Sequence, residues 1–290
     1  MKIGVITKVY YHFEGSKEAF LKMKADGYDT TDYQVFLKQQ PRIAAMSDGE
    51  LDAFLDEEKK NAEAAGIEIY QVHAPWDYPP RDGEVAIRER RHAATLRALK
   101  GAARLGATAL VVHPLAPECS DEAPDPDAVW QLNLDYFRDI VALGKKLGVY
   151  IAIENLPWPK YPFASPESVL KMAKELGDEV KVCLDVGHAN VLGVNLYDTV
   201  TMLGDRLIAL HLHDNDGTGD QHRLPFSGTA DWDGFCRGLA EIGFTGSLSL
   251  ETSRLPLGSL SEAEADSIRI QNAGLVKRLR RMVDSHIKTK

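Results

Sequence analysis

Residues 180–214, VKVCLDVGHANVLGVNLYDTVTMLGDRLIALHLHD, contain the pattern that decides the fold. Two short apolar runs, VKVCLDV and LIALHLHD, flank a helical segment, and each run ends in residues that can carry charge or bind a metal. The order strand, helix, strand is typical of parallel sheets, whose strands need a crossover connection. The same pattern recurs outward from this stretch along the whole 290-residue chain.

Eight such runs alternate with helical segments, and the second is the weakest strand candidate. Eight alternations close into a barrel with a packed interior, so the pattern predicts an α/β fold, one (β/α)8 TIM barrel over residues 1–290. A doubly wound open sheet is the alternative, but no strand is followed by a glycine-rich phosphate turn. The runs are KIGVIT (2–7), YDTTDY (28–33), IEIYQVHAP (67–75), TALVVHP (108–114), VYIAIENLP (149–157), VKVCLDV (180–186), LIALHLHD (207–214) and SLSLET (247–252).

The helical segments have recognisable ends. Ser47–Glu50 and Ser261–Glu264 have the spacing of a capping box, in which each side chain satisfies the other residue's free backbone amide. Asp125–Pro126 and Ser165–Pro166 place a cap residue before a proline at the first helical position. Glycines able to adopt a left-handed conformation follow six of the helices, namely Gly27, Gly66, Gly106, Gly148, Gly177 and Gly243.

The composition is that of a globular protein with an acidic balance. The chain has 34 Lys and Arg against 43 Asp and Glu, a net charge of −9, and 44% apolar residues. This charge disfavours a nucleic-acid partner, because phosphate backbones are bound by basic surfaces. No run approaches the roughly 18 apolar residues needed to cross a bilayer, and the first residues are interpreted as a strand rather than a signal peptide. We therefore expect a cytoplasmic protein with no membrane partner.

The three cysteines, Cys119, Cys183 and Cys236, are widely spaced and form no C-x-x-C motif. Their spacing indicates neither a disulfide framework nor a thiolate zinc cage. We expect them to be reduced, with Cys183 in a buried apolar role.

Six consecutive strands, the third to the eighth, each end in a side chain that can bind a metal. In such barrels the active site lies where the strands run into the following loops. Several ionisable groups at one barrel mouth would repel each other and lose hydration unless a cation lay among them. Carboxylate and imidazole ligands without thiolate suit manganese, zinc, cobalt or magnesium. The residues are His73, His113, Glu154, Asp185 with His188, His211 with His213 and Asp214, and Glu251.

The motifs after the last four strands resemble those of the xylose isomerase-like barrels. That superfamily includes sugar and sugar-phosphate isomerases and epimerases, inosose dehydratases and endonuclease IV. The similarity extends in order and spacing over nearly the whole chain. The motifs are Ile153-Glu154-Asn155, Leu184-Asp185-Val186-Gly187-His188, His211-Leu212-His213-Asp214, Asp220-Gln-His222, Gly228-Thr-Ala-Asp-Trp232 and Leu250-Glu251-Thr252.

The resemblance to the ketose epimerase branch implies one divalent ion held by Glu154, Asp185, His211 and Glu251. It implies a metal-dependent isomerase or epimerase of a small sugar, in which the metal acidifies a carbon-bound proton and stabilises an enediolate. Glu154 and Glu251 are the expected acid and base, on opposite faces of the substrate. His188 is the expected hydrogen-bond donor to the substrate oxygens.

The sequence departs from that branch at two positions. Ketose 3-epimerases tend to carry a second glutamate six residues after the first ligand and an arginine six residues after the histidine ligand. This chain has Lys160 and Gly217 there. The resemblance therefore implies the metal site but not ketose 3-epimerase specificity.

The endonuclease IV branch offers a different function. It uses nine ligands for three zinc ions. Four match the residues named above for the ketose epimerase branch, and the resemblance implies five candidates for additional metal or substrate ligands, at His73, His113, His188, Asp220 and His222. A multi-metal site suits phosphodiester cleavage. The short loop from His211 to Asp220 and the acidic composition argue against this branch, since a repair nuclease needs a basic track for DNA.

Two further functions use the same fold. A metal-dependent dehydratase or lyase acting on an inosose or keto-sugar would expel a hydroxyl, and a partner-dependent carbohydrate-binding subunit would have no turnover. Trp76 and Trp158, on loops at the mouth, are expected to bind substrate by stacking on a sugar ring or to form an apolar lid. Asp32, near the end of the second run, is placed either to reach the pocket or to anchor a loop, and the loop anchor is the favoured interpretation. The pattern is also compatible with a homo-oligomer.

Overall fold

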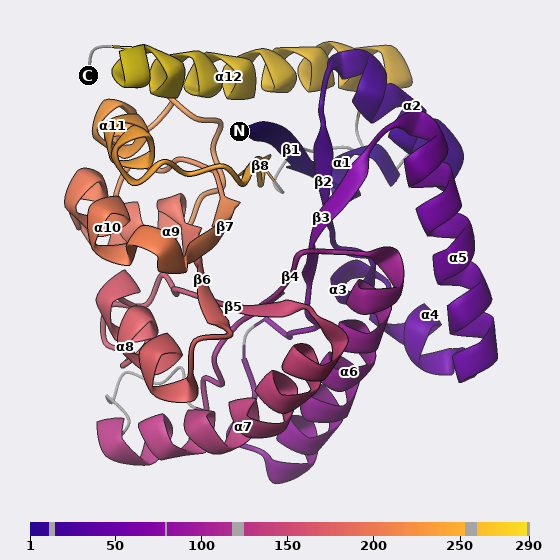
Figure 1. Ribbon diagram of the computed structural model, residues 1–290, viewed down its shortest axis with the longest axis vertical. Helices are drawn as coiled ribbons and strands as arrows, with labels where there is room; N and C mark the ends of the chain where they lie inside the picture. Colours follow the sequence, from indigo (N-terminus) through magenta and orange to yellow (C-terminus); the bar gives the residue numbers. More distant parts are fainter. Residues whose placement is uncertain (12–14, 79, 118–124, 253–259, 289–290) are drawn as a thin grey trace.

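The computed structural model describes residues 1–11, 15–78, 80–117, 125–252 and 260–288. Its centre is a sheet of eight parallel strands in the order β7-β6-β5-β4-β3-β2-β1-β8 (Figure 1). Each apolar run supplies one strand, so the predicted (β/α)8 TIM barrel is confirmed. The strands are β1 (Lys2–Ile6), β2 (Thr30–Tyr33), β3 (Glu68–His73), β4 (Ala109–Val112), β5 (Tyr150–Glu154), β6 (Val180–Asp185), β7 (Leu207–His211) and β8 (Ser247–Leu250).

The barrel closes where β7 meets β8. Leu212, directly after β7, forms a parallel bridge with Leu250 of β8. The Leu212 amide donates to the Ser249 carbonyl at 2.9 Å, and the Glu251 amide donates to the Leu212 carbonyl at 3.0 Å. The two edges that a doubly wound sheet would leave open are thus joined.

The weak second run forms β2, and its polar side chains explain why it is weak as a sequence signal. Thr30 and Asp32 are fully buried. Thr30 Oγ1 lies 2.5 Å from Ser247 Oγ, and Gln71 Nε2 donates to Asp32 Oδ2 at 3.2 Å. Hydrogen bonds inside the barrel therefore take the place of apolar contacts, and hydrophobicity alone underestimates this strand.

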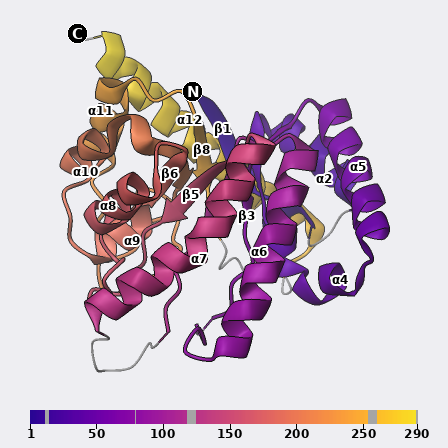
Figure 2. The ribbon, with the colours of Figure 1, turned by 60° about the horizontal axis from the view of Figure 1, so that its bottom comes forward.

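Helices cover the outside of the barrel (Figures 1 and 2). Both predicted capping boxes form: the Glu50 amide donates to Ser47 Oγ at 3.3 Å, and the Glu264 amide donates to Ser261 Oγ at 3.4 Å. The helices are α1 (Lys8–Tyr11), α2 (Ser16–Asp26), α3 (Val35–Lys38), α4 (Gln40–Ala45), α5 (Asp48–Ala65), α6 (Val85–Leu105), α7 (Pro126–Leu147), α8 (Pro166–Leu176), α9 (Val186–Val191), α10 (Leu196–Leu203), the 3-10 helix η1 (Gly204–Arg206), α11 (Trp232–Ile242) and α12 (Glu262–Lys288).

The last helix and the first strand lie side by side. Helix α12 contacts β1 and α2 (Figure 2), and Lys277 Nζ donates to the Asp26 carbonyl at 2.7 Å. Strand β1 also pairs with β8, with Lys2 opposite Ser247. Segments from opposite ends of the sequence therefore complete the barrel.

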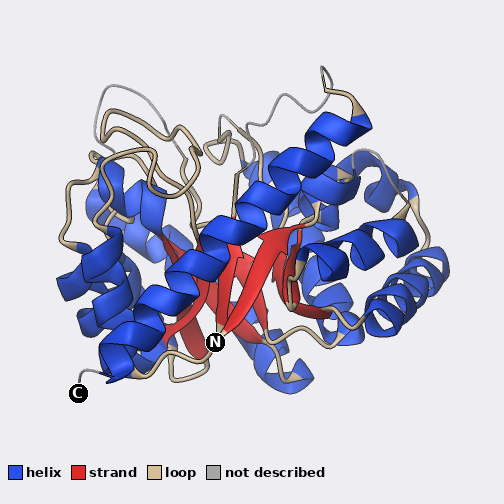
Figure 3. Ribbon diagram, turned by 90° about the horizontal axis from the view of Figure 1, so that it is seen from above, coloured by secondary structure: helices blue, strands red, loops and turns tan. Residues whose placement is uncertain are grey.

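A layer of small side chains fills the barrel interior just below the ends of the strands. Successive residues of a strand point to opposite faces, so a residue two positions before an inward side chain also points inward. This spacing holds for four members of the layer: Val111 precedes His113, Ala152 precedes Glu154, Cys183 precedes Asp185 and Ala209 precedes His211. The polar end of the barrel therefore rests on a compact apolar floor, and the longer loops gather at the end away from the N-terminus (Figure 3).

Cys183 and Cys236 are buried and free, in agreement with the prediction, whereas Cys119 lies outside the described residues. Within the described parts of the chain, no helix combines the length and the apolar character needed to span a bilayer.

Candidate metal centre

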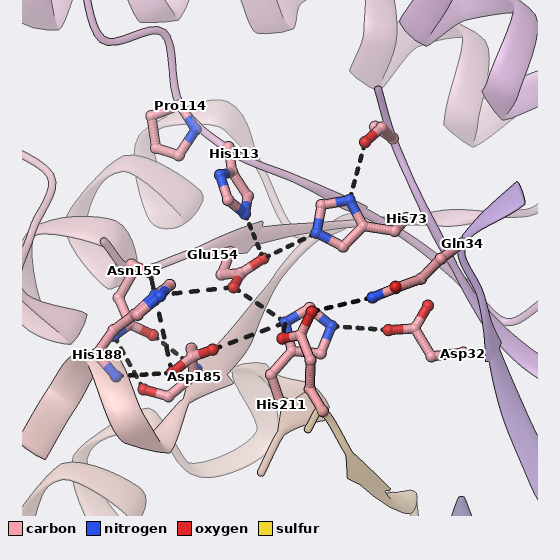
Figure 4. A network of polar contacts seen from close by, with 12 residues as sticks. Asp32, Gln34, His73, His113, Pro114, Glu154, Asn155, Asp185, His188 and His211 are labelled. Atoms are coloured by element: carbon pink, nitrogen blue, oxygen red, sulfur yellow. Dashed lines mark hydrogen bonds and ion pairs between the residues drawn. The ribbon is translucent and has the colours of Figure 1, made fainter. Parts of the chain in front are cut away.

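Four side chains from neighbouring strands converge at the mouth of the barrel. Glu154, Asp185 and His211 are the last residues of β5, β6 and β7, and Glu251 directly follows β8. One ligand atom from each lies within 4.8 Å of the others, and all four residues are buried (Figure 4). These are the four residues for which the sequence predicts a shared metal.

Glu154 occupies the centre of this group. Its Oε1 lies 2.9 Å from His211 Nδ1, and its Oε2 lies 2.9 Å from His113 Nε2 and 3.5 Å from His73 Nε2 (Figure 4). Burial alone would raise the pKa of Glu154, but the imidazoles of His211 and His113 hold it well below the ordinary value. Glu154 is therefore ionised at neutral pH.

His211 lies between several carboxylates. Its Nδ1 is 3.1 Å from Glu251 Oε2 and 4.0 Å from Asp185 Oδ2. Burial opposes protonation of His211, but Cys183, Glu154 and Glu251 around it raise its pKa well above the ordinary value. Without a metal, a protonated imidazole thus supplies the positive charge that these carboxylates require.

The residues of this centre fit a divalent ion. Every ion pair that the described residues form with Glu154, Asp185 and Glu251 involves a histidine, and none involves Lys or Arg. Burial would raise the pKa of Glu251, yet His211 and His222 lower it to about 2. Three buried carboxylates and one imidazole form a hard, thiolate-free donor set, which suits manganese, zinc, cobalt or magnesium.

A second group of side chains borders the first. His222 Nε2 lies 3.1 Å from Asp220 Oδ2, and His188 Nε2 lies 3.9 Å from the same oxygen. His188 Nδ1 is 2.8 Å from the Asn155 carbonyl, which directs its other nitrogen toward Asp220. All five additional residues for which the sequence predicts metal or substrate contacts therefore lie at this mouth, with His73 and His113 on the other side of Glu154.

The loop between β7 and α11 brings Asp220 and His222 back over the barrel. Its two arms pair through Asp214 and Arg223, whose backbone amides and carbonyls exchange two hydrogen bonds of 2.8 Å. His222 has a φ of 47°, an uncommon backbone conformation for a residue other than glycine. Its Nδ1 lies 3.0 Å from the Glu251 carbonyl, so this conformation is held by contact with a predicted ligand.

A cavity of about 500 Å³ opens above these residues. Trp76 and Trp158 both line it, and the centroids of the Trp76 and His113 rings are 4.3 Å apart. Among the lining residues that the structure describes there is no Lys or Arg. Arg223, on the nearby loop, donates from Nη2 to Asp216 Oδ2 at 2.8 Å.

Comparison with known proteins identifies the family. A family model described as "Xylose isomerase-like TIM barrel" matches residues 20–271. The chain belongs to this family.

Similar proteins include both uncharacterised members and named epimerases. The chain is 27% identical over 227 residues to the uncharacterised protein y4fM of Sinorhizobium fredii, an alignment covering 69% of this chain and 71% of that one. It is 29% identical over 117 residues to D-psicose 3-epimerase of Enterocloster bolteae, covering 39% and 37%.

Two solved structures share the fold over nearly their whole length. A D-tagatose 3-epimerase-like protein has a TM-score of 0.76 at 22% identity, covering 98% of this chain and 99% of its own. The IolI protein with a bound zinc atom has a TM-score of 0.76 at 18% identity, covering 99% of each chain.

Sequence reasoning missed several residues of this xylose isomerase-like site. Asp32 is not a loop anchor, because it lies inside the barrel with Oδ2 2.8 Å from His211 Nε2. Gln34 Nε2 donates to Glu251 Oε1 at 2.9 Å, and Asn155 accepts from the Asp185 amide at 2.8 Å. A signal was present for Asp32, since it lies near the end of a run that the barrel hypothesis requires, but its strand was too polar to stand out.

His213 is a further contact of the Asp185 ligand. His213 Nε2 lies 3.0 Å from Asp185 Oδ2, while Asp185 Oδ1 accepts from the His188 amide at 2.7 Å. Gly187 makes this packing possible, because a Cβ there would lie 1.9 Å from the His213 ring. The Asp-Val-Gly-His motif thus combines a predicted ligand, a close packing position and a histidine at the cavity.

Proposed function

We propose that this protein is a divalent-metal-dependent isomerase or epimerase of a small sugar or sugar derivative. The observation that carries the proposal is the buried convergence of Glu154, Asp185, His211 and Glu251 beneath a cavity lined by two tryptophans. The D-psicose 3-epimerase relative and the zinc-bearing neighbour support it. A cavity of about 500 Å³ is within the usual range for small-molecule sites.

Glu154, Asp185, His211 and Glu251 would hold the ion. Bound there, a divalent ion supplies Lewis-acid polarisation of the substrate oxygens, which acidifies a carbon-bound proton beside a carbonyl. Glu154 and Glu251 come from β5 and β8 and reach the site from different parts of the ring. Their lowered pKa values keep both ionised, so either carboxylate could take the carbon-bound proton. Its conjugate acid would return that proton to the neighbouring carbon in an isomerisation. In an epimerisation the other carboxylate would deliver a proton to the opposite face, after taking one up from solvent or a substrate hydroxyl.

Other residues orient the substrate. His188 lines the cavity and has its Nδ1 engaged by the Asn155 carbonyl, so its Nε2 is available to a substrate oxygen. Trp76 and Trp158 offer apolar faces on which a sugar ring can stack.

Solvent-deuterium exchange tests this proposal. Ketoses, aldoses and keto-glycosides are incubated with the Mn²⁺-loaded protein in D₂O and recovered for mass spectrometry. We expect one carbon-bound deuterium and a change of configuration or carbonyl position, without loss of water. Loss of water would identify the dehydratase alternative, and no exchange in any sugar would contradict the proposal and favour a partner-dependent binding subunit.

The Glu251→Gln variant tests the site itself. Loss of one anionic ligand and of one proton-transfer group should weaken Mn²⁺ retention and reduce turnover by at least about 10²-fold. The fold should remain, because glutamine preserves the shape of the side chain. Circular dichroism checks the fold, and normal turnover in this variant would refute the assignment of Glu251.

The crowded mouth supports one second candidate. His73, His113, His188, Asp220 and His222 surround the first centre, as a three-zinc phosphodiesterase would require. Metal analysis separates the two functions. About three zinc ions per chain, together with cleavage of abasic DNA, would establish the phosphodiesterase instead.

A further inference from the structure

Asp32 is a buried carboxylate that contacts a predicted ligand from behind. Asp32 lies on β2, whereas its partner His211 is the last residue of β7. Asp32 Oδ2 is 2.8 Å from His211 Nε2 (Figure 4) and 3.2 Å from Gln71 Nε2. The Asp32 side chain has no exposed surface.

The two nitrogens of His211 therefore face different groups. Nδ1 points to Glu154 at 2.9 Å and Glu251 at 3.1 Å, whereas Nε2 points to Asp32. An imidazole can bind a metal only through a nitrogen without a proton, and a carboxylate hydrogen-bonded to the other nitrogen fixes which one that is. We propose that Asp32 is a positioning residue that holds the proton on His211 Nε2 and presents Nδ1 to the metal.

The cost of burying Asp32 supports a role beyond packing. Its Oδ1 has no hydrogen-bond partner among the described residues, and its one ion pair there is with His211. Burial of a carboxylate with so few hydrogen-bond donors costs free energy unless the carboxylate is paired with a specific partner, which here is His211. An apolar residue would fill the space without that cost, but it would offer no acceptor for the proton on His211 Nε2.

Strand β2 supports a second ligand in the same way. Gln34, directly after β2, is buried and donates from Nε2 to Glu251 Oε1 at 2.9 Å. That contact leaves Glu251 Oε2 facing His211 Nδ1. The strand with the weakest sequence signal thus supplies none of the four ligands and orients two of them.

This inference rests on the proposed metal centre, and Mn²⁺ titration calorimetry tests it. Loss of a carboxylate behind a metal-binding histidine typically weakens metal affinity by about 10–100-fold, and we expect this for Asp32→Asn. The matched control is Thr31→Val, because Thr31 is the neighbouring residue on β2 and its Oγ1 donates to the Val5 carbonyl at 2.7 Å, away from the site. The control should bind Mn²⁺ within about 2-fold of the wild type.

The outcomes separate this inference from the proposed function. Equal Mn²⁺ affinity in the wild type and Asp32→Asn would refute the positioning role alone. No Mn²⁺ binding by the wild type would refute the metal centre and this inference with it. Equal weakening in Thr31→Val would show that β2 acts through general packing, which also overturns the role of Asp32.

A measurement on the wild-type chain covers the case in which Asp32→Asn does not fold. The protein is labelled with ¹⁵N-histidine and loaded with ¹¹³Cd²⁺, and the His211 signals are identified by their absence in His211→Gln. We expect ¹¹³Cd coupling at Nδ1 and a directly bonded proton at Nε2. Coupling at Nε2 would overturn the proposal.

Discussion

At the scale of single residues, the histidine and carboxylate network makes the stability of the metal-free protein depend on pH. Burial alone would lower the pKa of His222, but Asp220 and Glu251 raise it to about 9. A histidine whose pKa is raised on folding stabilises the fold fully below its unfolded pKa of about 6.5. This contribution is lost as pH rises through about 9.

We therefore expect the melting temperature of the metal-free protein to fall as the pH rises from about 6.5 to 9. The fall should be smaller in His222→Gln, because this variant lacks the contribution of His222. Differential scanning calorimetry across this range measures it. The control is His92→Gln, since His92 lies on α6 and contacts Tyr136 instead of the site. The same pH profile in His222→Gln as in the wild type would contradict the prediction.

Gly187 gives a steric prediction at the same scale. A Cβ at this position would lie 1.9 Å from the His213 ring, so Gly187→Ala must displace that histidine from Asp185. Overpacking of this kind costs about 1–3 kcal/mol, and the loss of the Asp185 contact should also weaken Mn²⁺ binding.

Chemical denaturation and calorimetry measure the two effects of Gly187→Ala. Gly193→Ala provides a glycine control on the same part of the chain, where a Cβ would meet no atom within 4 Å and only backbone strain at φ 66° is added. Unchanged Mn²⁺ affinity in Gly187→Ala would show that His213 does not support Asp185.

Much of the site could be predicted from single residues. Glu154, Asp185, His211 and Glu251 each end a strand-like run, and parallel strands of a barrel finish at the same end. Asp32 could not be assigned a contact, because its partner lies on the opposite part of the ring and only closure of the barrel brings them together. The conformation of His222 was likewise invisible, since it depends on how a loop folds back.

At the scale of elements, Arg91 of α6 contacts both the loop after β3 and the loop after β4, which carry site residues. Arg91 is buried, donates to Asp82 Oδ2 at 2.5 Å and to the His113 carbonyl at 2.7 Å, and lies over the Tyr136 ring. Asp82 also accepts from the Ala116 amide at 2.8 Å. The loop after β3 and the loop after β4 are thus fixed by one ion pair.

Removal of one member of this pair should be costly. Arg91→Met leaves Asp82 buried without its cation, for which we expect a loss of about 3–5 kcal/mol in the free energy of unfolding. Arg90→Met is the control, because Arg90 is the adjacent residue and is exposed. Denaturant titration measures both variants, and a change below about 1 kcal/mol in Arg91→Met would contradict this account.

The elements differed in how well their sequence patterns predicted them. Helices with capping boxes and glycine ends were predictable because the stabilising contacts are local in sequence. Strand β2 was the hardest element, because its inward residues are satisfied by Ser247 and Gln71 from other strands. The sequence of a single strand does not indicate which strands it pairs with. That prediction required all eight strand-helix units to be counted first, because the number eight indicates a closed barrel.

At the scale of the whole molecule, a bound ion should act as a clamp across the barrel. The four proposed ligands come from β5, β6, β7 and the residue after β8, so the ion would bind only the folded state. Binding that is restricted to the folded state stabilises it by about 2.7 kcal/mol when the free metal is at 100 times its dissociation constant.

Treatment with EDTA should therefore lower the melting temperature, and added Mn²⁺ should restore it in proportion to the logarithm of its concentration. Scanning fluorimetry over a series of Mn²⁺ concentrations measures this. The Glu251→Gln variant should show a much smaller rise. A melting temperature independent of Mn²⁺ in the wild type would contradict a metal clamp.

The pairing of β1 with β8 has a consequence for the order of events during synthesis. Strand β1 leaves the ribosome early but must wait for β8 before its second edge is paired, and Glu251 emerges after β8. Asp32 is made early, whereas its partner His211 follows much later. A nascent chain therefore lacks the complete set of proposed ligands until Glu251 is translated, so a metal ion would be bound by all four residues only after β8 has been made.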